Sequence, residues 1–78
     1  MITIFTASWC HKCLKLKYIL EAAAPPIEYT IIDVDEDPHS AVSNHIGVLP
    51  TIIFPSGRRH IGGISTFRFK ELLEEEEV

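Results

Sequence analysis

The feature that most constrains this chain is its only pair of cysteines, Cys10 and Cys13, placed where an apolar strand-like segment gives way to a helix-like one. Two thiols at this spacing on a first helical turn can close a small ring, and the helix N-terminus stabilises a thiolate there. We expect Cys10 to be the nucleophile and Cys13 the resolving thiol. The spacing alone is weak evidence, because zinc, cluster and haem sites share it; haem attachment fails, since Leu14 replaces the required histidine. In the plainest alternative, both cysteines are small buried hydrophobes.

The bulk properties narrow the class of protein. A length of 78 residues predicts one domain, residues 1–78, with a thin core. No apolar run approaches the 18 residues of a membrane span, so we expect a soluble protein without a membrane partner. The net charge of −4 argues against nonspecific nucleic-acid binding, which needs a clustered basic surface. We expect a monomer whose partners are proteins.

The start of the sequence bears on where the protein works. Met1 leads directly into the strand-like residues 2–5, which leaves no room for a charged segment, an apolar segment and a cleavage site. We therefore expect a cytoplasmic protein. In that reducing compartment a C-x-x-C pair is typically catalytic or metal-binding and is not a permanent staple.

Periodicity and turn residues predict the first four elements. Residues 2–5 alternate as a strand, and a helix begins at Cys10 and stops at Pro25-Pro26. A β-branched strand spans residues 27–34, and Asp37 caps a helix that starts with proline and ends at Gly47. The inward stripe of the first helix is Cys13, Leu16, Leu20 and Ala23.

The second half of the chain completes the order β-α-β-α-β-β-α. A strand over residues 51–54, a turn at 55–57 and a returning strand at 58–61 form an antiparallel hairpin, which Gly62-Gly63 ends. The last helix starts near Ser65 or Thr66, and its acidic end, residues 74–77, is expected to fray. Its predicted buried residues are Phe67, Leu72 and Leu73.

A second motif, forty residues after the cysteines, carries a family resemblance. Gly47-Val48-Leu49-Pro50-Thr51 opens the apolar run Ile52-Ile53-Phe54, which ends at Pro55-Ser56-Gly57. With the C-x-x-C, this chain resembles the thioredoxin/glutaredoxin superfamily over nearly its whole length, as a minimal, glutaredoxin-sized redoxin without the extra N-terminal strand and helix of thioredoxins. The resemblance implies an α/β, thioredoxin-like fold with a central four-stranded mixed sheet flanked by helices.

The resemblance also implies substrate-binding residues. The Leu49-Pro50 bond is expected to be cis and to lie opposite the cysteines, so that the backbone of Val48 and Leu49 can pair with an extended substrate. In this family Gly62 and Gly63 let a backbone pass close to the site, although a plain strand break is the simpler explanation. Trp9 is expected to border the substrate groove or to act as a hydrophobic anchor.

The residues between the cysteines depart from the family. His11 and Lys12 replace the usual Gly-Pro of thioredoxins and Pro-Tyr of glutaredoxins. Two potential cations there should lower the pKa of Cys10 and make the disulfide more oxidising, unless both side chains point to solvent. Thioredoxins also bury an aspartate six residues before the first cysteine, where this chain has Ile4. Help with proton transfer must come from elsewhere or be absent.

We therefore predict a thiol-disulfide oxidoreductase, an electron carrier that reduces disulfide-containing proteins without a cofactor. Thioredoxin reductase is the favoured electron donor over glutathione, because glutaredoxins generally have an acidic or otherwise polar pair after the double glycine, whereas here Ile64 comes first and Ser65-Thr66 follow without a carboxylate. A glutathione-dependent glutaredoxin is the first alternative. A C-x-x-C metal module or a shared cluster is the second, although no metal site is predicted: the four histidines lack the paired spacing of zinc fingers. These are His11, His39, His45 and His60.

Overall fold

The computed structural model describes residues 1–23 and 26–76, and its elements follow the predicted β-α-β-α-β-β-α order. The four strands form one sheet in the order β2-β1-β3-β4. β1 pairs with β2 in parallel and with β3 antiparallel, and β3 pairs antiparallel with β4. The predicted mixed sheet is confirmed. The element bounds are β1 Ile2–Thr6, α1 His11–Ala22, β2 Tyr29–Asp33, α2 Pro38–Ser43, β3 Thr51–Ile53, β4 Arg59–Ile61 and α3 Thr66–Glu76.

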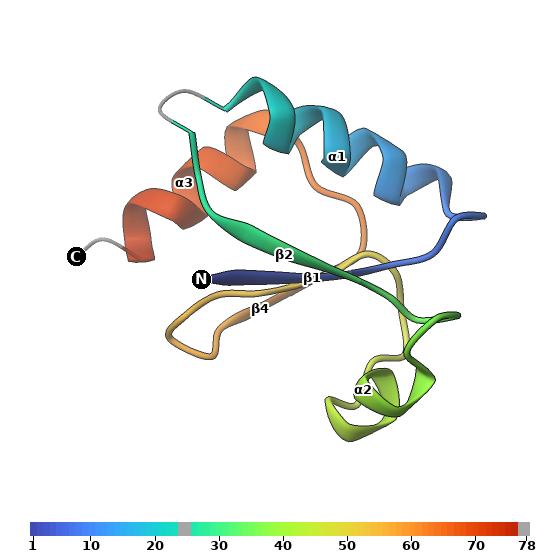
Figure 1. Cartoon of the computed structure of the whole chain (residues 1–78). Coiled ribbons are helices and arrows are strands. Elements are labelled where there is room, and N and C mark those ends of the chain that lie inside the picture. Colours follow the sequence, from blue (N-terminus) through green and yellow to red (C-terminus); the bar gives the residue numbers. More distant parts are fainter. Residues whose placement is uncertain (24–25, 77–78) are drawn as a thin grey trace.

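The helices cover both faces of the sheet. α1 and α3 lie on one face and the short α2 lies on the other (Figure 1). Because β1 and β2 are parallel and in register from Ile2 opposite Tyr29 to Thr6 opposite Asp33, their carboxyl ends meet at one edge. The segment that leads into α1 and the acidic segment after β2 therefore start side by side. No helix in the described part of the chain is long and apolar enough to cross a membrane.

The core lies between the sheet and the α1–α3 layer. The predicted inward stripe of α1 is confirmed at Cys13, Leu16 and Leu20, but α1 ends at Ala22 and the half-buried Ala23 is its C-cap. The helix stop predicted at Pro25 lies outside the described residues. The buried cluster consists of Ile2, Ile4, Leu16, Leu20, Ile52, Phe54, Phe69 and Leu72.

The second helix begins where the sequence predicts and ends earlier. Asp37 is its N-cap: one carboxylate oxygen accepts from the Ser40 amide at 3.1 Å and the other from the Ser40 hydroxyl at 2.7 Å. α2 stops at Ser43, so the predicted end at Gly47 is wrong. The Asn44 side chain donates to the Ser40 carbonyl at 2.8 Å, and His45 adopts a left-handed φ of 57°, which breaks the helix before the glycine.

The last helix buries a different aromatic residue from the one predicted. Phe67 is 74% exposed, whereas Phe69 is 1% exposed and fills the core with Leu72. Phe69 lies three residues before Leu72 and four before Leu73, so these three side chains share one face of the helix. Phe67 lies two residues before Phe69 and is therefore on another face. The prediction for Phe67 is therefore wrong, and Leu73 is only half-buried.

The end of α3 is helical to Glu76, where the sequence predicts fraying. The turn between β3 and β4 holds it: the Ser56 hydroxyl donates to the Glu76 carboxylate at 2.7 Å, and Arg58 pairs with Glu75. These contacts offset the unfavourable acidic charge at a helix C-terminus. The rest of the predicted tail, residue 77, lies outside the described residues.

Candidate active site

The two cysteines lie at the start of α1 and form a disulfide, with their Cα atoms 5.3 Å apart. Cys10 is the N-cap residue, in the extended region with φ −94° and ψ 110°, and the Cys13 amide donates to its Sγ at 3.2 Å. Cys10 is half-buried, whereas Cys13 is 5% exposed on the inward face of the helix. Cys10 is therefore the more exposed of the two cysteines.

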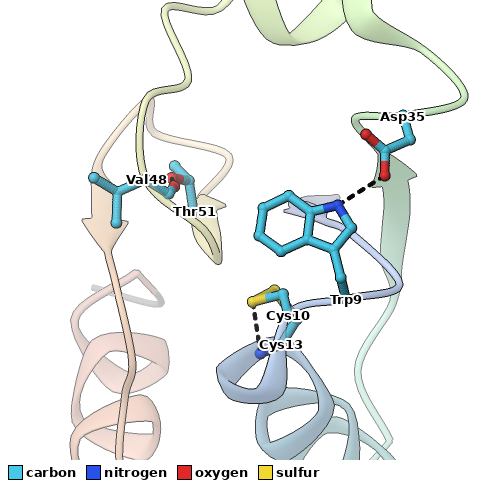
Figure 2. The surroundings of a disulfide bond; sticks show 6 residues. All are labelled: Trp9, Cys10, Cys13, Asp35, Val48 and Thr51. Atoms are coloured by element: carbon cyan, nitrogen blue, oxygen red, sulfur yellow. Dashed lines mark hydrogen bonds between the residues drawn. A yellow bond between two sulfur atoms is a disulfide. The ribbon is translucent and has the colours of Figure 1, made fainter.

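An aromatic residue anchored by a carboxylate lies on one side of the disulfide. Trp9 is 66% exposed, and its indole Nε1 donates to Oδ2 of Asp35 at 2.9 Å. The amide of Asp35 donates in turn to Oδ1 of Asp33 at 2.8 Å, which shapes the turn that follows β2. Figure 2 shows the indole between Asp35 and the disulfide. The segment after β2 thus fixes an exposed aromatic surface beside Cys10.

The segment before β3 faces this aromatic residue across the site. The Leu49-Pro50 bond is cis, as the sequence predicts. Pro50 is buried and Val48 is 52% exposed, and the Thr51 hydroxyl donates to the Val48 carbonyl at 2.6 Å. In Figure 2, the Trp9 ring lies above the disulfide, and Val48 and Thr51 lie to the left of both.

The double glycine joins the two parts of the site. The Gly62 amide donates to the Pro50 carbonyl at 2.8 Å, and Gly62 has a φ of 90°, a conformation that favours glycine. Gly63 is exposed and has no positive φ. It faces the side chain of Lys12, whose Cδ would lie 3.3 Å from a Cβ at this position. His11, the other residue between the cysteines, is exposed.

A groove of about 650 Å³ runs between α1 and the β1–β2 edge, and both cysteines and His11 line it. Ile4, which stands where thioredoxins bury an aspartate, also lines this groove and is fully buried. The carboxylate in the lining is Asp33, at the end of the neighbouring strand and only partly exposed. The acidic group in the groove therefore comes from β2, one strand away from its usual source.

The structure thus brings together nearly all the predicted site residues in three segments: the start of α1, the residues before β3 and the double glycine. Sequence reasoning missed the residues of a fourth segment, Asp33 and Asp35. A signal was present, because these carboxylates follow a strand expected to be parallel to the one before Cys10, and the carboxyl ends of such strands meet at one edge. Within residues 1–23 and 26–76, no group of three or more histidine, cysteine, aspartate or glutamate side chains could hold a metal ion.

Comparisons with known proteins identify relatives of this arrangement. The family model for glutaredoxin matches residues 2–48. The chain is similar to a mutant thioredoxin from Halobacterium salinarum NRC-1, with 27% identity and a TM-score of 0.80 over 96% of this chain and 72% of that one. It is also similar to chloroplastic thioredoxin z, with 30% identity and a TM-score of 0.78 over 97% and 76% of the two chains.

The chain is also similar to a solved structure described as that of a malarial protein, with 21% identity and a TM-score of 0.79. The alignment covers 99% of this chain and 96% of that one. At this identity the likeness concerns the fold alone. No curated protein sequence matches the chain. The similarity to the two thioredoxins confirms the thioredoxin-like fold.

Proposed function

The chain belongs to the glutaredoxin family, within the thioredoxin/glutaredoxin superfamily, and from this premise we propose that it carries electrons to disulfides of other proteins. A glutaredoxin/thioredoxin-like domain with Cys10 and Cys13 at disulfide distance supports a thiol-disulfide oxidoreductase. One observation carries the finer proposal: the more exposed cysteine of this pair caps a helix, and the segment around the cis-proline bond lies on the same side of the molecule, as Val48 and Thr51 show in Figure 2. The cytoplasm, which keeps such dithiols reduced, is the proposed location.

The proposed reaction has two exchange steps. The Cys10 thiolate attacks one sulfur of the substrate disulfide, so that a mixed disulfide forms and the first substrate sulfur leaves as a thiolate. Cys13 then loses its proton and attacks the Cys10 sulfur, which releases the second substrate sulfur. Two electrons pass from the protein to the substrate, the two leaving thiolates take up two protons, and the protein ends with the intramolecular disulfide.

The start of α1 favours Cys10 as the attacking group. The Cys13 amide points at the Cys10 sulfur from 3.2 Å, and the positive end of the helix lies at the same place. Both stabilise a thiolate over a thiol. Within the described residues no amide donates to the Cys13 sulfur, and Cys13 is 5% exposed, so an external disulfide reaches it less easily. The geometry supports the order in which Cys10 attacks and Cys13 resolves.

Asp33 is the proposed destination of the Cys13 proton. Its carboxylate lines the groove that also contains both cysteines, whereas Ile4 offers no ionisable group. One Asp33 oxygen is occupied by the Asp35 amide, and the other accepts no hydrogen bond within the described part of the chain. A water molecule in the groove can link this oxygen to the Cys13 thiol.

The substrate is proposed to lie as an extended segment across the cysteines. The backbone of Val48 and Leu49 pairs with it, next to the cis bond, and the Trp9 indole covers its other side. Main-chain pairing of this kind gives affinity with little dependence on sequence. Substrate choice then depends on the exposed side chains at the rim, such as Val48 and Trp9.

Thioredoxin reductase is proposed as the electron donor, in preference to glutathione. Glutaredoxins generally place an acidic or otherwise polar pair after the double glycine for the glutathione amino group, but here no carboxylate follows it, and Ile64 is half-buried and packs against the core. The Ser65 hydroxyl accepts from the Arg68 amide at 3.1 Å as the cap of α3, so it is already engaged. Glutathione would therefore lose a charged anchor.

Two parallel assays test the donor. The protein at low concentration reduces insulin disulfides, with NADPH consumption followed through thioredoxin reductase or through glutathione and glutathione reductase. We expect turnover with a thioredoxin reductase from a related source and slow turnover with millimolar glutathione. Rapid turnover with glutathione and none with any thioredoxin reductase tried would assign the protein to glutathione-dependent reduction.

A further inference from the structure

The aliphatic part of Lys12 lies directly against Gly63. A Cβ on this glycine would stand 3.3 Å from Cδ, 3.8 Å from Cγ and 3.9 Å from Cε of Lys12. The first of these distances is shorter than nine in ten real Cβ contacts. The lysine stem therefore runs along the glycine, and a larger residue at position 63 would displace it.

The loop that carries this glycine is anchored and cannot easily retreat. The Gly62 amide donates to the Pro50 carbonyl at 2.8 Å, and the Gly63 carbonyl lies 3.1 Å from the His60 ring nitrogen Nε2. Gly63 itself does not have a positive φ, so a side chain there meets no backbone strain. An added side chain would move the flexible lysine and would leave the backbone in place.

The charge of Lys12 is available to the active site. Lys12 is on the first turn of α1, between the two cysteines. The ion pairs of the described residues join Arg58 to Glu75 and Arg68 to Glu71, so no carboxylate in that part of the chain neutralises its ammonium group. A free cation held here acts on whatever charge develops on the nearby sulfur.

We propose that Gly63 is a positioning residue whose missing side chain keeps the Lys12 ammonium beside the cysteine pair, where its charge favours the Cys10 thiolate. The inference rests on the proposed role of Cys10 as the attacking thiol. It does not depend on which reductase supplies electrons. In this proposal Gly63 acts on Cys10 indirectly, through the side chain of Lys12 on α1. This role is separate from any contact that Gly63 makes with a substrate.

Other charged or titratable groups lie on the elements that form the site. On α1, His11 is adjacent to it and Lys17 lines the same groove. The segment that ends β2 contributes Asp33 and Asp35, and β4 contributes His60, whose ring contacts the Gly63 carbonyl. Their effects remain in every variant described below, so comparisons at the same pH isolate the lysine.

The test measures thiolate formation at one sulfur. In a Cys13→Ser background Cys10 is the only thiol, and its alkylation rate by iodoacetamide across pH gives its pKa. Lys12→Met removes the charge and Gly63→Val displaces it. In water, two unit charges about 4 Å apart interact by about 1 kcal/mol, which changes the thiolate-to-thiol ratio roughly fivefold, and the effect falls as the distance grows. We expect Lys12→Met to raise the pKa of Cys10 and to lower the thiolate-to-thiol ratio by up to this factor, and Gly63→Val to shift both in the same direction by a smaller amount.

Gly47→Val is the matched control, because Gly47 is also exposed, has no positive φ and would place its Cβ in open space. It should leave the pKa of Cys10 unchanged. Gly63→Val should add nothing in a Lys12→Met background, because the displaced charge is already absent. Gly63→Ala replaces the valine variant if circular dichroism shows a loss of fold.

Three results would overturn the proposal. If the pKa of Cys10 shifts in Lys12→Met but not in the Gly63 variants, Gly63 does not position the lysine. No shift in either would show that the lysine charge does not act on Cys10. A shift from Gly63→Val that persists without the lysine would assign the effect to the loop backbone. None of these pKa measurements uses a reductase. The choice of electron donor is therefore tested independently, by the NADPH assays described above.

Discussion

Two phenylalanines two residues apart on α3 allow a matched test of how this helix packs. Phe69 is 1% exposed in the core, and an aromatic side chain buries about 150–250 Å² of surface. Its replacement by alanine should lower the free energy of unfolding by about 3–5 kcal/mol. A chain of 78 residues has a total of roughly 4–12 kcal/mol. Phe69→Ala should therefore remove a large part of the stability.

Phe67 is the control, because it is 74% exposed on the same helix. Phe67→Ala gains the same helix propensity and should change stability by no more than about 0.5 kcal/mol. Urea unfolding of the oxidised proteins, followed by circular dichroism, gives both free energies. Equal losses in the two variants, or the larger loss at Phe67, would refute the packing of α3 described here.

Three further predictions concern the carboxylates at the end of β2 and in the segment between β2 and α2. Asp35→Ala should free the indole of Trp9, the sole tryptophan of the chain. The fluorescence anisotropy of Trp9 should then fall and the KM for protein disulfides should rise. Unchanged anisotropy would exclude the anchoring role of Asp35. Asp33→Asn, which keeps an acceptor for the backbone but loses the charge, should slow release of the mixed disulfide and alter its pH profile; an unchanged profile would show that the proton goes elsewhere. Hydrogen bonds from Ser40 hold the pKa of Asp37 below its usual range. The ionised Asp37 therefore stabilises the folded protein above the ordinary carboxyl pKa, and this stabilisation is lost as the pH falls through the lowered pKa. The difference in thermal stability between the parent and Asp37→Ala should therefore shrink below about pH 4, and a difference that stays constant there would contradict this.

Much of the fold was predictable because local signals agreed with the tertiary structure. Asp37 before a proline predicted the start of α2, and the cis-proline motif predicted the bond at Leu49-Pro50. The end of α2 was missed because Asn44 and His45 terminate the helix by a side-chain bond and a left-handed φ, which compete with the more obvious glycine. On α3, the spacing of Phe69 from Leu72 already contained the correct face.

The remaining site contacts join residues that are distant in the sequence. Trp9 and Asp35 are 26 residues apart, and their hydrogen bond depends on the parallel register of β1 and β2. The approach of Lys12 to Gly63 depends on how α1 packs against the loop after β4. Neither contact follows from local propensity, since each requires the packed arrangement of two elements.

Trapping of mixed disulfides tests the central claim, the separate roles of the two cysteines. The protein with Cys13→Ser and the protein with Cys10→Ser are each reduced and mixed with a disulfide-bonded protein substrate. Adducts are then counted by mass spectrometry without reductant. Cys13→Ser should accumulate a mixed disulfide through Cys10, because attack is still possible and resolution is not. Cys10→Ser should accumulate little, because the remaining thiol is 5% exposed. Equal trapping by both variants, or more by Cys10→Ser, would contradict the assignment.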